Sequence, residues 1–139
     1  MTVVELSSFV VSALQANHLF NDVRIVQERV FSNEQFALKI RAQLAESWQL
    51  QIYLYYNRGH YDYAYQVFYV TSIMRWDNKE DCPGLANFPH HYHPQDGGPP
   101  VSSTLVGNPL TDLPIVIASL EDLVVSVPLS RLGRRVLKR

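Results

Sequence analysis

"FALKIRAQL" (residues 36–44) and "WQLQIYLYY" (residues 48–56) each alternate apolar and polar residues with a period of two. This period predicts β-strands that bury one face, because successive side chains of a strand point to opposite sides of a sheet. Lys39 and Arg41 then lie on the outward face of the first strand, and Tyr53 and Tyr55 on that of the second. Only a short turn separates the two stretches, so we predict an antiparallel pair.

The flanking segments extend this pair into a meander. Residues 22–31 are rich in β-branched side chains and predict a preceding strand. "NRGH" supplies a hairpin turn at Gly59, and residues 61–76 predict one long strand that contains a bulge or a bend. Persistent alternation would place Phe68, Val70, Met74 and Trp76 toward the core, and Tyr65, Tyr69, Arg75 and Asp77 outward.

Two amphipathic segments predict helices that cover one face of this sheet. Residues 3–16 carry an apolar stripe of helical period, formed by Val3, Leu6, Val10, Ala13 and Leu14. Ser119 and Asp122 predict a capped helix start, and Pro128 predicts its end. The stripe of this second helix is Leu120, Leu123, Val124 and Val127. We therefore predict an α+β fold, an antiparallel β-meander of about four strands with an N-terminal and a C-terminal helix packed on one face.

The chain length and the charge distribution predict one domain with a basic tail. The 139 residues suffice for one core, which we assign to residues 1–127 with a long loop at 78–114. Five of the twelve basic residues fall in the last nine positions, and the remaining seven face thirteen acidic residues. A tail at 128–139 with Arg134 and Arg135 favours an anionic partner, while a solvated terminus is the alternative.

The composition argues against membrane and secreted classes. No run approaches the roughly 18 apolar residues that cross a bilayer, and Glu5 stands where a signal peptide needs a basic flank. Cys82 is the only cysteine, which precludes an internal disulfide and fits a reducing compartment. We therefore expect a soluble, cytoplasmic protein without a membrane partner.

The stretch "FPHHYHP" (residues 88–94) holds three of the five histidines. In an extended loop His91 and His93 point in one direction and His90 in the other. The HxH pair is a two-point clamp, and zinc or manganese would need a further ligand, for which the candidates are Asp77, Asp81, Cys82 and Asp96. A divalent metal held by His91, His93 and Asp77 is thus an alternative to a site without any cofactor.

The same residues also suit chemistry without a metal. Cleavage of RNA by its own 2′-hydroxyl needs a base, an acid and a cation near the phosphate, and imidazoles suit the first two roles. His90, His91 and His93 are the candidates for acid and base. Arg75 would stabilise the phosphate, and Asp77 would orient a histidine. The alternative for Arg75 and Asp77 is an ion pair at the rim of the sheet.

An outward sheet face with tyrosines and basic residues would bind unpaired RNA. Bases stack on aromatic rings, and basic side chains neutralise phosphates. Tyrosine equally suits a half-buried sheet surface that binds nothing. The RNA-binding candidates are Lys39, Arg41, Tyr53, Tyr55, Tyr65, Arg134 and Arg135.

"RWDN" at 75–78 followed by "FPHHYH" at 88–93 resembles the signature of the TumE family, the toxin components of bacterial and archaeal toxin–antitoxin modules, whose typical run reads "RYDNAPHHPELPTFPHHKH". The alignment needs no gap, and the wider resemblance covers residues 34–127. Glu80, Asp81 and Cys82 stand where the family has an earlier "PHH". Residues 95–114 form an insertion relative to the family.

The resemblance implies a toxin that acts on RNA as an endoribonuclease and is neutralised by a cognate antitoxin protein. The histidine loop, Arg75 and Asp77 would form its catalytic site. Two other functions fit the residues, namely a non-catalytic module that binds protein or nucleic acid in a larger complex, and a metal-dependent nuclease. The edge strand of such a meander would also permit a homodimer.

Overall fold

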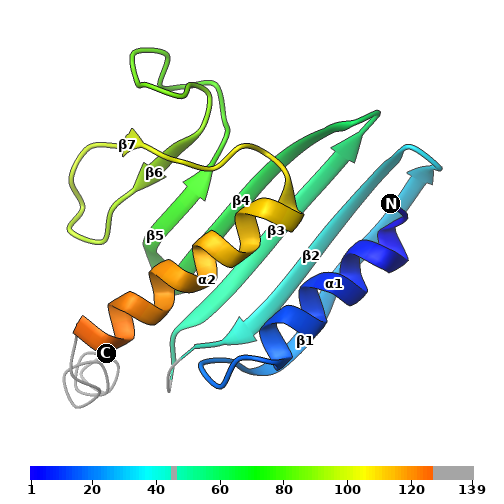
Figure 1. Cartoon of the computed structure of the whole chain (residues 1–139), viewed down its shortest axis with the longest axis horizontal. Helices are drawn as coiled ribbons and strands as arrows, with labels where there is room; N and C mark the ends of the chain where they lie inside the picture. Colours follow the sequence, from blue (N-terminus) through cyan, green and yellow to red (C-terminus); the bar gives the residue numbers. More distant parts are fainter. Residues whose placement is uncertain (45–46, 127–139) are drawn as a thin grey trace.

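Within residues 1–44 and 47–126, which this computed structural model describes, seven strands pair in sequence order to form one antiparallel sheet. Both helices lie on the same face of the sheet (Figure 1). The predicted α+β meander with its two helices is thereby confirmed, although the expected number of about four strands is too small. The elements are α1 (Val3–Gln15), β1 (Asn21–Ser32), β2 (Gln35–Gln43), β3 (Gln49–Asn57), β4 (His60–Tyr69), β5 (Thr71–Asp77), β6 (His91–His93), β7 (Val101–Ser102) and α2 (Pro109–Ser126).

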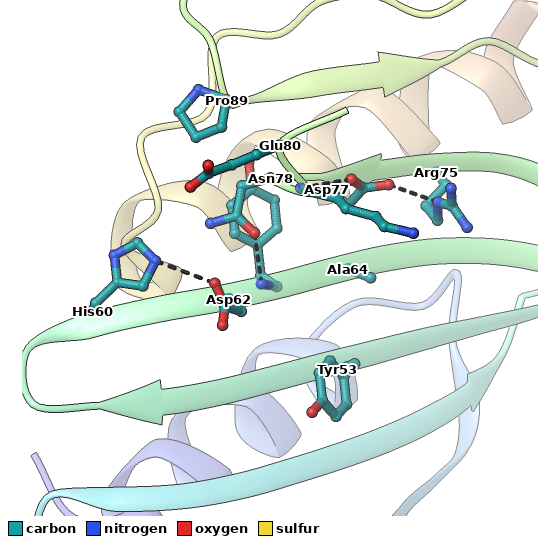
Figure 2. Close-up of a pocket in the computed structure, with 11 residues that line it drawn as sticks. Tyr53, His60, Asp62, Ala64, Arg75, Asp77, Asn78, Glu80 and Pro89 are labelled. Atoms are coloured by element: carbon teal, nitrogen blue, oxygen red, sulfur yellow. Dashed lines mark hydrogen bonds and ion pairs between the residues drawn. The ribbon is translucent and has the colours of Figure 1, made fainter. Parts of the chain in front are cut away.

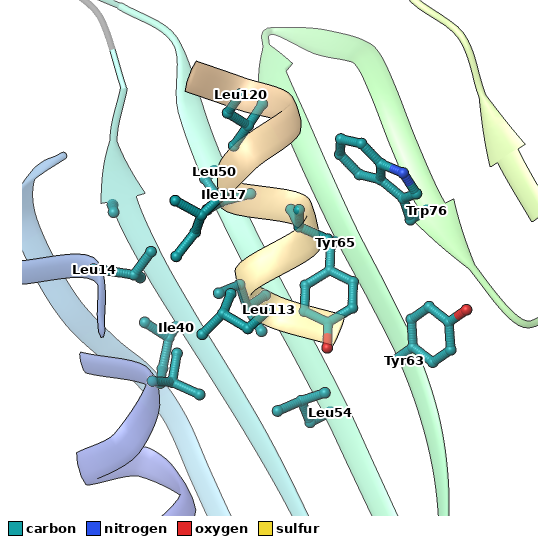
Figure 3. Close-up of a cluster of buried hydrophobic side chains, with 14 of the residues drawn as sticks. Leu14, Ile40, Leu50, Leu54, Tyr63, Tyr65, Trp76, Leu113, Ile117 and Leu120 are labelled. Carbon is teal, nitrogen blue, oxygen red and sulfur yellow. The ribbon is translucent and has the colours of Figure 1, made fainter. Parts of the chain in front are cut away.

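The core forms between the sheet and the two helices, as the alternation in β2 and β3 predicts. These strands pair in unbroken register from Gln35 opposite Asn57 to Gln43 opposite Gln49. Their even-numbered side chains from Phe36 to Ala42 and from Leu50 to Leu54 are buried and meet residues of both helices (Figure 3). Among the labelled core residues are Leu14, Ile40, Leu50, Leu54, Leu113, Ile117 and Leu120. The opposite face of the sheet carries no helix in the described part of the chain (Figure 1).

The predicted long strand at 61–76 is instead a hairpin of β4 and β5. The chain reverses at Val70, which has a φ of 61° and an exposure of 89%. Valine is rare in this left-handed conformation, because its branched Cβ clashes with the backbone. The sequence thus lacks the glycine or asparagine that marks most such turns. The predicted core position of Val70 is therefore wrong.

The hairpin also changes which residues of β4 face the core. Tyr63, Tyr65 and Val67 point inward, and Tyr65 is only 1% exposed. The predicted outward, RNA-binding role of Tyr65 is therefore wrong, because its ring is part of the core. Phe68, expected in the core, lies on the outer face, where the Arg41 guanidinium is 5.5 Å from its ring centroid. Tyr69, expected outward, instead packs against the core.

The alternation of β5 agrees with the prediction despite the extra turn. Met74 and Trp76 are buried in the core, and Arg75 and Asp77 take the opposite side. After β5, the predicted loop at 78–114 contains two short strands and the first turns of α2.

Helix α2 begins at Pro109, well before the predicted start at Ser119. Asn108 caps it, since its Oδ1 accepts a hydrogen bond from the Leu110 N–H, and proline is suited to the first helical position. The segment up to Pro114 was predicted as loop because it is rich in proline and glycine, yet Pro114 lies inside the helix. Ser119 lies mid-helix and its hydroxyl donates to the Ile115 carbonyl. Val127, Pro128 and the basic tail at 128–139 lie outside the described residues.

We predict that Val70→Gly stabilises the protein, because glycine adopts a positive φ without steric cost. The free energy of unfolding should rise by about 1 kcal/mol, as measured by chemical denaturation. Val4→Gly is the control, since Val4 is an exposed valine in α1 and glycine lowers helix stability there. A lower unfolding free energy for Val70→Gly than for the parent chain would contradict the strained turn.

Candidate active site

The candidate site is created by the pairing of β5 with β6. The register places Arg75 opposite His93, Trp76 opposite Tyr92 and Asp77 opposite His91. Because directly paired residues share one face of a sheet, the arginine, the aspartate and the two histidines project together from the outer face. Trp76 and Tyr92 project to the core side, with ring centroids 4.8 Å apart.

Two asparagines hold the strand ends in place. Asn78 follows β5, accepts a hydrogen bond from the Tyr63 N–H at 3.0 Å and donates to the Tyr61 carbonyl at 2.8 Å. Asn87 precedes β6 and donates to the carbonyls of Ser103 and Leu105. The "N" of "RWDN" therefore has a structural role, because it ties the end of β5 to β4.

Asp77 is the centre of the cluster. Its Oδ2 lies 2.7 Å from Arg75 Nε and its Oδ1 lies 3.0 Å from His91 Nε2. The Lys79 N–H also donates to Oδ1 at 3.0 Å. The buried carboxylate thus lies between a guanidinium on one side and an imidazole on the other, and ionic contacts at these distances restrict the positions of the side chains.

His91 is wholly buried and its two nitrogens have different partners. Nδ1 lies 3.0 Å from the Pro89 carbonyl, which can only accept, so Nδ1 carries a hydrogen. Nε2 faces Asp77 Oδ1 and also lies 3.1 Å from His93 Nε2. Its side chain is only 1% exposed, so in this structure His91 contacts its neighbours in the cluster and not the solvent.

His93 is the accessible imidazole of the cluster, with a side chain that is 30% exposed. Its Nε2 lies 3.3 Å from Arg75 Nη2 and 3.5 Å from Asp77 Oδ2. Partial burial and the Arg75 charge lower the pKa of His93, because both disfavour the imidazolium. A neutral imidazole at pH 7 suits His93 to accept a proton.

A cleft of about 460 Å³ lies on the outer face beside this cluster (Figure 2). Its floor follows one cross-strand row, in which Tyr53 of β3 pairs with Ala64 of β4 and Ala64 with Asp77 of β5. The methyl group of Ala64 leaves space between the larger side chains on either side. The wall includes Arg75, Lys79, Glu80 and Pro89.

Four predicted RNA-binding residues share this outer face with the cluster. Lys39 pairs directly with Tyr53, which lines the cleft, and Tyr55 is the next outward residue of β3. Arg41 donates to Gln51 Oε1 at 2.8 Å, next along β2 from Lys39. Arg134 and Arg135 lie outside the described residues.

His90 is separated from the other two histidines, as the alternation of an extended chain predicts. Its Nδ1 lies 2.8 Å from the hydroxyl of Tyr63, a core residue, and its ring stacks on the Tyr63 ring. Burial lowers the pKa of His90. The structure therefore does not bring His90 together with Arg75 and Asp77.

Among the lining residues that sequence reasoning missed, two define the end and the floor of the cleft. His60 lines one end and pairs with Asp62 at 3.2 Å, and the signal for it was the "NRGH" turn (Figure 2). Ala64 gave no signal, since a single alanine in a strand has no chemistry of its own.

Two groups of side chains have the geometry to hold a metal ion. Asp77, His91 and His93 form one, and Asp81, Cys82 and His91 form the other, with the ligand atoms in each group within 4.8 Å of one another. Among the described residues, Asp96 belongs to neither group.

Comparison with protein families shows to which family the chain belongs. A profile of the family described as Toxin TumE matches residues 10–124, which include the whole cluster. The chain belongs to the TumE family. The predicted family is thus confirmed, and the TumE match extends well beyond the motif at 75–93. No curated protein and no solved structure matches the chain. Neither described helix of this TumE protein is long and apolar enough to cross a membrane.

We predict that Arg75→Ala raises the pKa of His93, because the neighbouring positive charge is removed. The measurement is an NMR titration of the histidine ring protons in EDTA, in parent and variant chains. In the parent, His93 should titrate at lower pH than histidine in the urea-unfolded chain. An unchanged or lower His93 pKa in Arg75→Ala would contradict the contact.

Proposed function

We propose that this TumE-family protein is the toxin of a toxin–antitoxin module, and that it stops growth by cleaving single-stranded RNA in the cytoplasm. The observation that carries the proposal is the cluster of Arg75, Asp77, His91 and His93 at the edge of an open, basic and aromatic sheet face. A cognate antitoxin would be its protein partner, as the family description implies.

The chemistry proposed is attack of a ribose 2′-hydroxyl on the adjacent phosphate. His93 takes the hydroxyl proton, because it is the exposed and neutral imidazole of the cluster. Arg75 stabilises the charge that develops on the phosphate oxygens, since its guanidinium lines the cleft. The 5′-oxygen leaves with a proton, and we assign the donor role to His60, an exposed imidazole at the end of the same cleft.

Asp77 and His91 act as positioning residues. Asp77 holds the Arg75 guanidinium through Nε, and Nη2 lies 3.3 Å from His93 Nε2, a contact that would give way to the phosphate and the 2′-hydroxyl. His91 is fixed by Pro89 and Asp77 and packs edge-on against His93 with ring centroids 4.9 Å apart. Each therefore restricts the orientation of a reacting group, which is a large part of catalytic efficiency.

The substrate class follows from the face beside the cleft. Lys39 and Arg41 supply positive charge for phosphates, and Tyr53 supplies a ring on which a base can stack. Stacking on a ring requires an unpaired base, so a single-stranded segment fits and a duplex does not. An RNA strand that crosses the outer face from β2 toward β5 would bring one of its phosphates to Arg75.

We predict that Arg75→Ala and His93→Ala each reduce RNA cleavage at least about 100-fold, because each removes a group that acts on the reacting atoms. The measurement is cleavage of a labelled single-stranded RNA together with growth after induction. His18→Ala is the control, since His18 is exposed in the α1–β1 connection. Variants that remain fully toxic, with stable capture of a protein complex, would favour a non-catalytic binding module.

We predict that Ala64→Leu lowers kcat/KM for RNA about tenfold or more, because the larger side chain fills the floor of the cleft. Ala64→Ser is the matched control and should leave the rate nearly unchanged. The His93 ring resonances should keep their parent titration in both variants, which shows that the cluster is intact. Full activity of Ala64→Leu would place the substrate elsewhere.

A further inference from the structure

Three side chains of the cluster have ligand atoms at spacings close to those of the ligands of one zinc ion, all within 4.8 Å of one another. His91 Nε2 lies 3.0 Å from Asp77 Oδ1 and 3.1 Å from His93 Nε2, and His93 Nε2 lies 3.5 Å from Asp77 Oδ2. Nitrogen and oxygen ligands at the usual zinc distances and tetrahedral angles are about 3.3 Å apart. The three side chains therefore need little movement to coordinate a single ion.

The hydrogen bond of His91 selects the nitrogen that a metal requires. Because Nδ1 donates to the Pro89 carbonyl, Nε2 is the nitrogen that faces Asp77 and His93. A hydrogen on Nε2 would pair with Asp77, and an ion that binds there would replace it. A histidine that binds metal usually donates its other ring hydrogen to a carbonyl or carboxylate in this way. The two imidazole nitrogens and the carboxylate thus converge on one position that a cation could take.

A fourth ligand is available from the segment after β5. Asp81 Oδ1 lies 3.6 Å from His91 Nε2, and the Cys82 thiol donates to the same Asp81 oxygen at 3.4 Å. Asp81, Cys82 and His91 themselves form a group of metal-ligating geometry. A set of two imidazoles, a carboxylate and a thiolate suits zinc and excludes magnesium as the preferred ion.

We propose that Asp77, His91 and His93 bind a zinc ion, with a side chain of the Asp81–Cys82 pair as the fourth ligand. The bound ion occupies the His93 nitrogen that would take the 2′-hydroxyl proton. Zinc therefore inhibits RNA cleavage, and this second part rests on the proposed function. The site itself depends only on the ligand geometry.

Arg75 distinguishes metal binding from the proposed catalysis, because its guanidinium competes with the metal for the same atoms. Nη2 lies 3.3 Å from His93 Nε2, a contact that must break when the ion binds. The Nε contact with Asp77 Oδ2 can remain, since the ion can take Oδ1. Arg75 is partly exposed and can swing outward. Removal of Arg75 should thus strengthen metal binding while it abolishes the proposed catalysis.

The test is a titration of the full chain with Co²⁺ after treatment with EDTA and desalting, followed by displacement of Co²⁺ by Zn²⁺. We expect one equivalent of Co²⁺ with the absorption bands of tetrahedral coordination. His93→Ala and Asp77→Asn should weaken binding at least about tenfold, Arg75→Ala should tighten it about tenfold, and His18→Ala should leave it unchanged. Circular dichroism confirms that each variant is folded.

Cys82→Ser and Asp81→Asn identify the fourth ligand. If the parent shows a thiolate-to-cobalt charge-transfer band that Cys82→Ser removes, Cys82 is the ligand. If the band is absent and Asp81→Asn weakens binding, Asp81 is the ligand. If neither variant changes the spectrum or the affinity, the proposed coordination is wrong.

RNA cleavage measured in EDTA and with added Zn²⁺ separates this proposal from the function. If the chain cleaves RNA in EDTA and one equivalent of Zn²⁺ stops the cleavage, both the inhibitory zinc site and the proposed function are supported. Activity in EDTA from a chain that binds no Co²⁺ overturns the metal site and leaves the function standing. Tight Co²⁺ binding with cleavage that requires the metal supports the site but overturns zinc as an inhibitor and His93 as the base.

Discussion

The buried carboxylate of Asp77 is the group on which the arrangement of the outer face depends. A charge removed from water is costly unless oppositely charged or hydrogen-bonding partners surround it. Asp77 meets this requirement with Arg75 at 2.7 Å, His91 at 3.0 Å and the Lys79 N–H at 3.0 Å. The loss of any one partner would leave a buried charge that the others only partly compensate. The site and the local stability of β5 are therefore coupled.

The residues that follow β5 position His91 and His93 beside Asp77. A strand as short as β6 is not stable by itself, so its position relies on packing and on the surrounding loops. Tyr92 packs on Trp76 from the core side, and Asn87 ties the start of β6 to the segment before α2. That segment is fixed in turn by Asp112, whose carboxylate accepts the N–H groups of Val106 and Gly107. Helix α2 thus supports the imidazoles as well as the core.

Much of this fold could be predicted from the sequence where burial imposes a regular period. β2 and β3 alternate cleanly because one face meets two helices, and α1 has its stripe and capping box at Thr2 and Glu5. The turn at Val70 could not be predicted, since no glycine or asparagine marks it. That one turn reversed the faces assigned to Tyr65 and Phe68.

Part of the candidate site could also be predicted from the sequence. The two-residue spacings of Arg75 with Asp77 and of His91 with His93 predict shared faces in extended chain, and the structure has both pairs on the outer face. The register that joins them depends on the path of residues 78–90, which no local pattern specifies. Ala64 was missed because its contribution is the absence of a larger side chain.

The proposed reaction is cleavage by a 2′-hydroxyl that His93 deprotonates, and the most direct test uses the substrate itself. A short single-stranded RNA would be compared with copies that carry one 2′-deoxy nucleotide at each position in turn, with the product ends identified by mass spectrometry. We expect cleavage to stop only when the deoxy nucleotide is on the 5′ side of the cut, with 2′,3′-cyclic phosphate products. Continued cleavage at that deoxy position, with 5′-phosphate products, would contradict the account and indicate attack by water.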